Sequence, residues 1–298
     1  MSTNMKLTNL FKETKKSYKE LEKRYDDLYA QYIKDRYAII DAKKAELEDL
    51  KDEYEYNRLM LEKPLKAEKY RLKALKRKEH RRLNEAPRRG LLEEIGNSVS
   101  HGVGALFGIA ALVLMILKAD SPLSLMAAII YGSCIFFQML FSCLYHSFRA
   151  GSTVKRIFRR FDYSSIYLEI GGTFAPLFLL YMPEKMWGLS WGITLFSIQW
   201  ALIILGITFV GVFGPGRIRW LHFTLYFCIG WSAIMFLPTW FSKDFPLFCY
   251  ILGAGVVYTV GMIPFAALRK KPVAHFIFHL IVLTASVLMW VGIYLYVF

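Results

Sequence analysis

The feature that most constrains this chain is the series of apolar segments that fills its last two-thirds. Seven of them are long enough to cross a hydrocarbon core, which needs about 20 helical residues. They lie near residues 97–118, 124–148, 162–182, 187–213, 218–238, 245–268 and 273–297. The sequence therefore predicts an all-α integral membrane protein, with seven transmembrane helices in a membrane domain over residues 91–298.

Residues 1–90 have the opposite composition. They hold 25 of the 38 Lys and Arg and 17 of the 24 Asp and Glu in the chain. The basic start is followed by more charge and not by an apolar stretch, so no signal peptide is expected. The four cysteines all fall inside apolar segments and form no CxxC pair, which predicts free thiols. We therefore expect residues 1–90 to be a charged cytosolic extension.

A long helix is predicted from Lys15 to about Glu62, because this stretch lacks Gly and Pro and is rich in helix formers. Pro64 should end it. Apolar residues recur every seven positions, but the partner positions three residues later are mostly polar, which makes a weak coiled-coil seam. The recurring residues are Ile33, Ile40, Leu47, Tyr54 and Leu61. A homodimer through this helix and a solvated amphipathic helix both remain open.

Residues 65–89 are strongly basic, with eleven Lys or Arg against three Glu. A basic segment directly before a first membrane span is expected to lie against the anionic inner leaflet, where each cation contributes roughly 1 kcal/mol. Nucleic-acid binding is the competing interpretation of such a patch. Membrane proximity explains the charge without a further partner, so no nucleic acid is expected.

The charges between the apolar segments predict an orientation. If the N-terminus is cytosolic, ten Lys and Arg fall on the inside and three on the outside, as the positive-inside rule requires. The inside set is Arg149, Lys155, Arg156, Arg159, Arg160, Arg217, Arg219, Arg269, Lys270 and Lys271, and the outside set is Lys118, Lys185 and Lys243. We therefore expect a multi-pass protein of the plasma membrane, with its N-terminus cytosolic and its C-terminus outside.

Two histidines open the last apolar segment. His275 and His279 stand four residues apart, so they share one helix face about 6 Å apart along the axis and could bind the same metal ion. His146 lies near the inner end of the second segment, with Ser142 one turn deeper. These positions put polar groups of two helices at one depth.

Two further segments bring polar residues to that depth. Glu94, Asn97 and His101 follow the i, i+3, i+7 spacing of one helix face at the start of the first segment, and Asp162 opens the third. Ionisable residues inside a membrane are costly and usually mark a functional site. The predicted orientation places this convergence near the cytosolic leaflet.

Three histidines with an open fourth position form a common catalytic zinc arrangement. The spacing favours His275 and His279 as two ligands. His146 is the favoured third ligand, because Ser142 lies one turn deeper on the same helix as His146, and His101 is the alternative. A hydrogen-bonded packing role is the other interpretation of each intramembrane histidine.

Glu169 lies seven residues after Asp162, so it faces the same way about 10 Å deeper. Three roles are open for it: a second acid or base near the metal, a partner for a histidine, or a neutral carboxyl bonded to a neighbouring helix.

Taken in order, these motifs resemble the hemolysin III branch of the progestin and adipoQ receptor superfamily. They are E-x-x-N-x-x-x-H, S-x-x-x-H, the Asp that opens the third segment, and H-x-x-x-H on the seventh, and the resemblance covers about residues 90–298. It implies a seven-helix fold with a cytosolic N-terminus. It does not cover residues 1–90, and Glu169 stands where the family pattern usually has an apolar residue.

The resemblance also implies site roles. Zinc would be held by His146, His275 and His279, Asp162 would hold a water molecule, and Ser142 would be a nearby hydrogen-bond donor. The superfamily is linked to intramembrane metal-dependent hydrolases related to alkaline ceramidases, which cleave lipid amides.

Two functions follow as hypotheses. The first is a zinc-dependent intramembrane hydrolase that cleaves an amide or ester bond of a membrane lipid near the cytosolic leaflet, with Asp162 and Ser142 as catalytic residues. The second is a receptor or pore-forming, haemolysin-like protein in which zinc only ties helices together. The nearly apolar outer halves of the segments weigh against a pore.

Overall fold

The computed structural model describes residues 3–62, 64–182, 190–267 and 273–298, and these residues form helices with no strand among them. The chain divides into two compact units, Met1–Glu79 and His80–Phe298. Some residues of the orientation prediction, Lys185, Arg269, Lys270 and Lys271, lie outside the described ranges.

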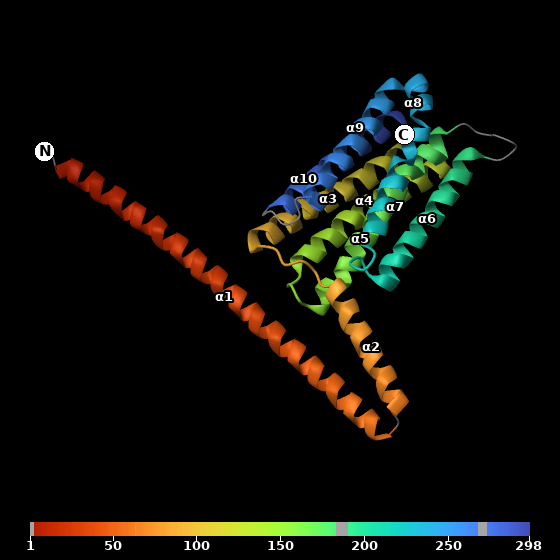
Figure 1. Cartoon of the computed structure of the whole chain (residues 1–298). Helices are drawn as coiled ribbons and strands as arrows, with labels where there is room; N and C mark the ends of the chain where they lie inside the picture. Colours follow the sequence, from red (N-terminus) through yellow and green to blue (C-terminus); the bar gives the residue numbers. More distant parts are fainter. Residues whose placement is uncertain (1–2, 63, 183–189, 268–272) are drawn as a thin grey trace. The chain divides into compact units, whose positions relative to one another are not determined.

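The N-terminal unit consists of the long helix α1 (Thr3–Glu62) and most of α2 (Pro64–Leu83), whose last residues belong to the second unit (Figure 1). The prediction that Pro64 ends the first helix is confirmed: Pro64 opens α2, where its missing N–H costs no hydrogen bond. The helix begins earlier than the predicted Lys15. Side-chain contacts join α1 to α2; for example, the Tyr70 hydroxyl donates to Asp52 Oδ1 at 3.1 Å, and Lys78 Nζ donates to Asp49 Oδ1 at 2.6 Å.

The seven-residue repeat of α1 is solvated in the single chain. Ile40, Leu47 and Tyr54 are 40%, 69% and 68% exposed. The repeat therefore contributes little to the fold of one chain, and its apolar side chains are available to a partner.

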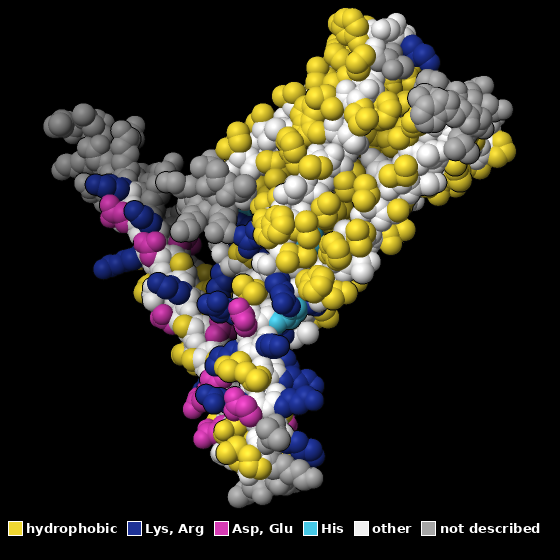
Figure 2. Space-filling model, turned by 45° about the vertical axis from the view of Figure 1, so that its right-hand side comes forward, with side chains coloured by type: hydrophobic (Ala, Val, Ile, Leu, Met, Phe, Trp, Pro, Cys, Tyr) yellow, Lys and Arg dark blue, Asp and Glu magenta, His cyan; other side chains and the backbone are white. Residues whose placement is uncertain are grey.

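The second unit is a bundle of apolar helices (Figure 1). Among the residues that the structure describes, five stretches are long and apolar enough to cross a membrane: α3 (Leu91–Lys118), α4 (Pro122–Ser147), α6 (Trp191–Phe213), Phe245–Phe265, which begins with α9 (Phe245–Met262), and α10 (Ala274–Tyr296). Figure 2 shows hydrophobic side chains over most of the visible bundle surface, whereas Lys, Arg, Asp and Glu gather on the helices of the N-terminal unit. The chain is an all-helical integral membrane protein.

Helix α5 (Thr153–Pro176) begins earlier than the predicted third segment, because the Ser152 side chain accepts the N–H of Lys155 at 3.0 Å and caps it. The expectation that Lys155 and Arg159 lie in a loop is wrong, since both are on this helix and 1% exposed; their cytosolic side stays a prediction. Arg159 Nη1 donates to the Glu85 carbonyl at 2.8 Å. The charges are buried because each finds an acceptor within the bundle.

The expected continuous helix over 218–238 is also wrong. The structure divides it into α7 (Arg219–Gly230), a 3₁₀ turn η2 (Trp231–Met235) and α8 (Leu237–Lys243). Pro238 stands in the first turn of α8, where it has no N–H to continue the preceding helix. The indole N–H of Trp231 bonds Thr259 Oγ1 at 3.0 Å, which ties the break to α9.

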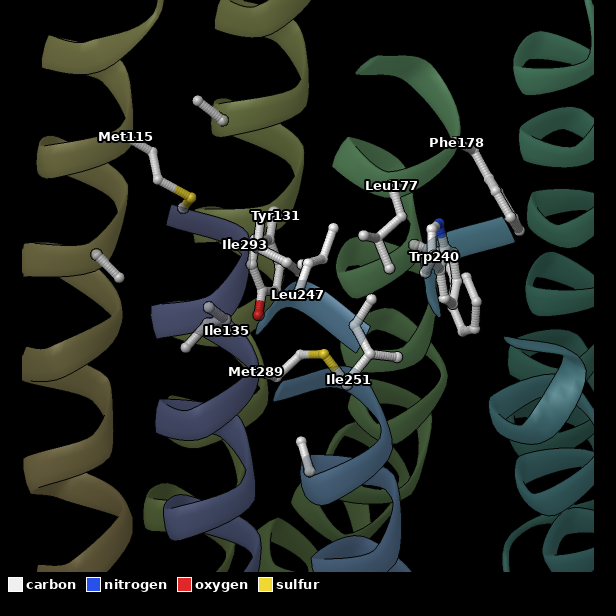
Figure 3. Close-up of a cluster of buried hydrophobic side chains, with 14 residues drawn as sticks. Met115, Tyr131, Ile135, Leu177, Phe178, Trp240, Leu247, Ile251, Met289 and Ile293 are labelled. Atoms are coloured by element: carbon white, nitrogen blue, oxygen red, sulfur yellow. The ribbon is translucent and has the colours of Figure 1, made fainter. Parts of the chain in front are cut away.

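A π-helical turn, η1 (Leu177–Tyr181), continues α5, and its first residues join the largest buried cluster (Figure 3). Side chains from α4, η1, α8, α9 and α10 meet there, among them Tyr131, Ile135, Leu177, Trp240, Leu247, Ile251, Met289 and Ile293. Because lipid is as apolar as these side chains, close packing and not transfer from water must stabilise such contacts.

Glycine makes that packing close between α3 and α4. A Cβ on Gly132 would lie 2.6 Å from Leu112 Cα, and one on Gly108 would lie 2.7 Å from Phe136 Cα. The two backbones therefore touch at these positions. This contact fixes α4, which carries one of the histidines.

The segment before α3 is bound to the connection between α6 and α7. Asn84 Nδ2 donates to the Phe213 carbonyl at 3.0 Å, and Asn84 Oδ1 accepts the Gly216 N–H at 3.1 Å. Gly214 has a φ of 75°, in the left-handed region that favours glycine. The beginning of the second unit is thereby fixed before the first apolar helix starts.

Candidate metal centre

Three buried histidines form a group whose ligand atoms all lie within 4.8 Å of one another: His146 on α4 and His275 and His279 on α10. The two on α10 are one turn apart, so they share a face as their spacing predicts. Helix α10 starts only one residue before His275, after Val273, whose φ of 65° is unusual for a β-branched residue. The structure thus brings together the three residues expected as ligands.

The arrangement of nitrogens suits a cation. His146 Nε2 lies 3.3 Å from His275 Nε2, and His279 Nδ1 is buried with no hydrogen-bond partner among the described residues. Metal–nitrogen bonds of about 2.0–2.1 Å in a tetrahedral zinc site put two ligands about 3.3 Å apart. Nitrogen lone pairs this close repel unless a proton or a metal ion lies between them. The three histidines therefore fit a metal ion.

Glu94 fixes the orientation of the His146 ring. Its Oε2 lies 2.5 Å from His146 Nδ1, and its Oε1 accepts Lys155 Nζ at 2.9 Å. A carboxylate at this distance requires a donor, so Nδ1 carries the ring proton and Nε2 keeps its lone pair. A carboxylate behind a metal-binding histidine is a recurring arrangement that fixes the tautomer.

Lys155 completes this group, with its Nζ also bonded to the Phe148 carbonyl at 2.9 Å. Its charge balances that of Glu94 inside the bundle. Lys155 is not among the site residues that the sequence predicts. A signal was present, since a lone lysine needs a carboxylate when a helix carries it into a bundle.

Asn97 and His101 come from the same face of α3 as Glu94, as predicted. Asn97 is fully buried, with Nδ2 3.3 Å from His146 Nδ1. His101 is not part of the three-histidine group; its ring lies against that of His279 with centroids 3.9 Å apart. Neither His101 ring nitrogen makes a well-formed hydrogen bond to the described residues. His101 therefore packs on a ligand ring.

Asp162 and Ser142 line a cavity beside the histidines. The Ser142 hydroxyl is the hydrogen-bond partner of the Asp162 carboxylate. A hydroxyl has one proton to donate, so while Ser142 bonds Asp162 it does not donate elsewhere. Ser142 therefore faces Asp162, and its catalytic role stays a prediction.

The cavity has a volume of about 210 Å³ and passes from Arg89 and the histidines into the apolar centre of the bundle. One water needs only about 10–15 Å³ of such volume, so the space is large enough for part of an organic ligand. Most of its wall is apolar, from Phe174, Leu177 and Ile251 among others.

Glu169 also lines the cavity but lies outside the histidine group. Its Oε1 accepts Ser286 Oγ at 2.7 Å and the Tyr258 hydroxyl at 3.2 Å. Neither Tyr258 nor Ser286 was singled out from the sequence. The available signal was a spacing of seven, which separates Ser286 from His279 as it separates Glu169 from Asp162.

Known proteins match this chain over the residues that form the bundle. A family model described as "Haemolysin-III related" matches residues 89–290. The protein "Hemolysin-3" of Bacillus cereus is 34% identical over 209 residues, which cover 69% of this chain and 92% of that protein. "Hemolysin-3 homolog" of Bacillus subtilis (strain 168) is 33% identical over 208 residues, or 68% of this chain and 94% of that protein.

The family match leaves out residues 1–88, which include α1 and α2, and takes in all three histidines and Asp162. The apolar helices and the Bacillus relatives make the chain a multi-pass integral membrane protein, which in a bacterium resides in the plasma membrane. By the extent of the family match and by these two relatives, the chain belongs to the haemolysin III family.

Proposed function

We propose that this protein is a zinc-dependent intramembrane hydrolase that cleaves an amide or ester bond of a membrane lipid. The observation that carries the proposal is the meeting of three histidine nitrogens beside a largely apolar cavity. Two of these histidines, His275 and His279, line that cavity together with Asp162. Hydrolysis at a lipid carbonyl requires a group that activates water, a base, and an apolar pocket for the hydrocarbon chain, and a metal site beside a carboxylate and an apolar cavity provides all three.

His146, His275 and His279 would hold the zinc, and Glu94 would keep His146 in the tautomer that binds it. When bound, zinc acidifies water and polarises a carbonyl. The rest of the chemistry falls to the cavity wall. The Asp162 carboxylate transfers the protons, the Ser142 hydroxyl orients that carboxylate, and apolar side chains of the wall hold the hydrocarbon chain of the lipid.

Asp162 acts as the general base and acid. It takes a proton from water as the water oxygen attacks the carbonyl carbon, and it returns that proton to the leaving nitrogen or oxygen as the old bond breaks. The products are a carboxylic acid and an amine or alcohol. Ser142 holds the Asp162 carboxylate by its hydrogen bond, which leaves the other lone pairs of that carboxylate free for the water.

The proposed topology has seven crossings, with the N-terminus cytosolic and the C-terminus outside. Helix α5 would be the third crossing and α7, η2 and α8 together the fifth, alongside the five apolar stretches. Labelling of single cysteines introduced near Lys118 and near Phe298 from outside intact cells tests it, and absence of outside labelling at both positions would refute this topology.

We propose that the charged extension binds the membrane surface and a second copy of the chain. Residues 65–89, with their excess of Lys and Arg, would lie on anionic inner-leaflet lipids, and residues 1–90 would form a cytosolic domain. The exposed repeat on α1 would pair with the same repeat of another chain.

The test of function uses purified full chain in lipid nanodiscs. We expect about one zinc per chain, release of fatty acid from ceramide-like amides or from phospholipid esters, and a loss of release by roughly 10²–10⁴-fold in Asp162→Asn with zinc retained. His222→Ala is the control, since His222 is buried outside the group and bonds Tyr167. Full zinc occupancy without release from any amide or ester would refute the hydrolase.

A further inference from the structure

The cavity has a second group of polar side chains deeper in the bundle, which the proposed chemistry does not use. It consists of Gln138 on α4, Glu169 on α5, Tyr258 on α9 and Ser286 on α10, and we call it the deep polar layer. Gln138, Glu169 and Tyr258 line the cavity, and Ser286 bonds Glu169 from behind.

Three members of the deep polar layer lie seven or eight residues from His146, Asp162 and His279 on three helices. Gln138 lies eight residues from His146, Glu169 seven from Asp162, and Ser286 seven from His279. Seven residues are about two helical turns, or about 10 Å. The cavity therefore has two polar levels about 10 Å apart, with apolar wall around and between them.

Two acceptor atoms of the deep polar layer receive no hydrogen bond from the described residues. Glu169 and Gln138 are each only 5% exposed, and Glu169 Oε2 and Gln138 Oε1 have no hydrogen-bond partner among the described residues. Tyr258 and Ser286 already direct their protons to Glu169 Oε1 or to each other. A buried acceptor without a donor is unfavourable, so a ligand that brings a donor would be stabilised here.

Beyond this layer the wall is mostly apolar. Thr173, four residues after Glu169, is a polar exception, and its hydroxyl donates to the Glu169 carbonyl at 2.8 Å. Leu177, Ile251 and Met289 line the cavity and belong to the buried cluster of Figure 3. The ligand must therefore be apolar on both sides of its donor. A hydroxyl within a hydrocarbon chain meets this description, whereas a bulky charged head group does not.

We propose that the deep polar layer is a subsite for a hydroxyl group carried within an acyl chain, about 10 Å from the carbonyl that lies at the histidines. The position of the carbonyl rests on the proposed hydrolase function. The hydroxyl contact itself does not, because it needs only that an acyl chain enters the cavity.

The test measures binding and not turnover. Purified full chain in nanodiscs is titrated with 10-hydroxyoctadecanoic acid, octadecanoic acid and 18-hydroxyoctadecanoic acid, each in competition with a radiolabelled octadecanoic acid. The first has its hydroxyl near the required depth, the second has none, and the third has it at the far end. We expect the 10-hydroxy acid to bind about tenfold more tightly than either of the others, as one added hydrogen bond allows.

Substitutions in the deep polar layer test whether the preference for the 10-hydroxy acid arises there. Glu169→Met and Gln138→Leu should each remove most of the preference for the 10-hydroxy acid while octadecanoic acid still binds. Gln199→Leu is the matched control, because Gln199 is equally buried but does not line this cavity among the described residues, and it should keep the preference.

Equal binding of the three acids, no binding of any of them, or a preference that survives both variants would overturn the proposal. If the 10-hydroxy acid is preferred but no lipid is ever hydrolysed, the hydroxyl subsite stands and the hydrolase does not. Loss of hydrolysis in Asp162→Asn with the preference intact supports both.

Discussion

Replacing Glu94 by glutamine should weaken metal binding although Glu94 is not itself in the ligand group. In the structure its two oxygens serve two donors, His146 Nδ1 at 2.5 Å and Lys155 Nζ at 2.9 Å. A glutamine has one acceptor oxygen and an NH₂ group in the same space. If the oxygen stays with Lys155, the NH₂ faces Nδ1, which must then become an acceptor.

This change moves the ring proton of His146 to Nε2, the nitrogen that lies 3.3 Å from His275 Nε2. A protonated Nε2 has no lone pair for a metal, and the alternative tautomer sets two N–H donors against each other. Loss of a carboxylate behind a metal-binding histidine typically lowers metal affinity 10–100-fold. That is about 1.4–2.7 kcal/mol of binding free energy.

The measurement is a zinc titration of the purified chain against a chelator of known affinity. Glu93→Gln is the matched control: Glu93 is the neighbouring carboxylate, bonded to Arg89 at 3.1 Å. An affinity of Glu94→Gln within twofold of the unaltered protein, or an equal decrease in Glu93→Gln, would refute the tautomer argument.

Three further predictions concern the scaffold. Gly132→Ala should lower the free energy of unfolding of the bundle by about 1–3 kcal/mol, because the added Cβ would lie 2.6 Å from the α3 backbone. Gly211→Ala is the control and should have no such effect, since nothing lies within 4 Å of its Cβ position. Thermal unfolding in detergent compares the two variants, and equal melting temperatures would contradict this account. Burial, with the carboxylates of Asp52 and Glu55 nearby, raises the pKa of Tyr70 from 10.0 to about 12. The Tyr70 contribution to pairing of α1 with α2 is therefore present below pH 10 and lost as the pH rises toward 12; spin-label distances between α1 and α2 should lengthen over that range, and an unchanged distance would count against it. Leu47→Glu should abolish any dimer formed through α1, as measured by light scattering, and a dimer that persists would show that α1 is not the contact.

The sequence predicts the apolar helices well, because a membrane span needs a long apolar stretch and little else. The predicted segments at 124–148 and 273–297 agree closely with α4 and α10. Prediction is poorer where polar residues enter the bundle. The stretch 218–238 reads as one apolar segment, and only the placement of Pro238 and the contact of Trp231 with α9 reveal its break.

In the candidate site, too, some contacts can be predicted from the sequence and others cannot. A spacing of four is enough to place His275 and His279 together, since it depends on one helix. The pairing of Glu94 with both His146 and Lys155 depends on three helices whose rotation the sequence does not state. Lys155 illustrates this, because as a cation beside an apolar segment it suggests a loop, and only its carboxylate partner on another helix allows burial.

The attachment of Asn84 to the carbonyl of Phe213 and the N–H of Gly216 sets a limit for anyone who shortens this protein. Residues 1–79 form a separate compact unit and lie outside the family match, which makes them an obvious part to remove. A cut at residue 89, where that match begins, would discard Asn84 together with the Glu85 carbonyl that accepts Arg159. The bundle would then expose a buried guanidinium and a glycine connection with its hydrogen bonds unmade, so the shortest version worth expressing begins at or before His80.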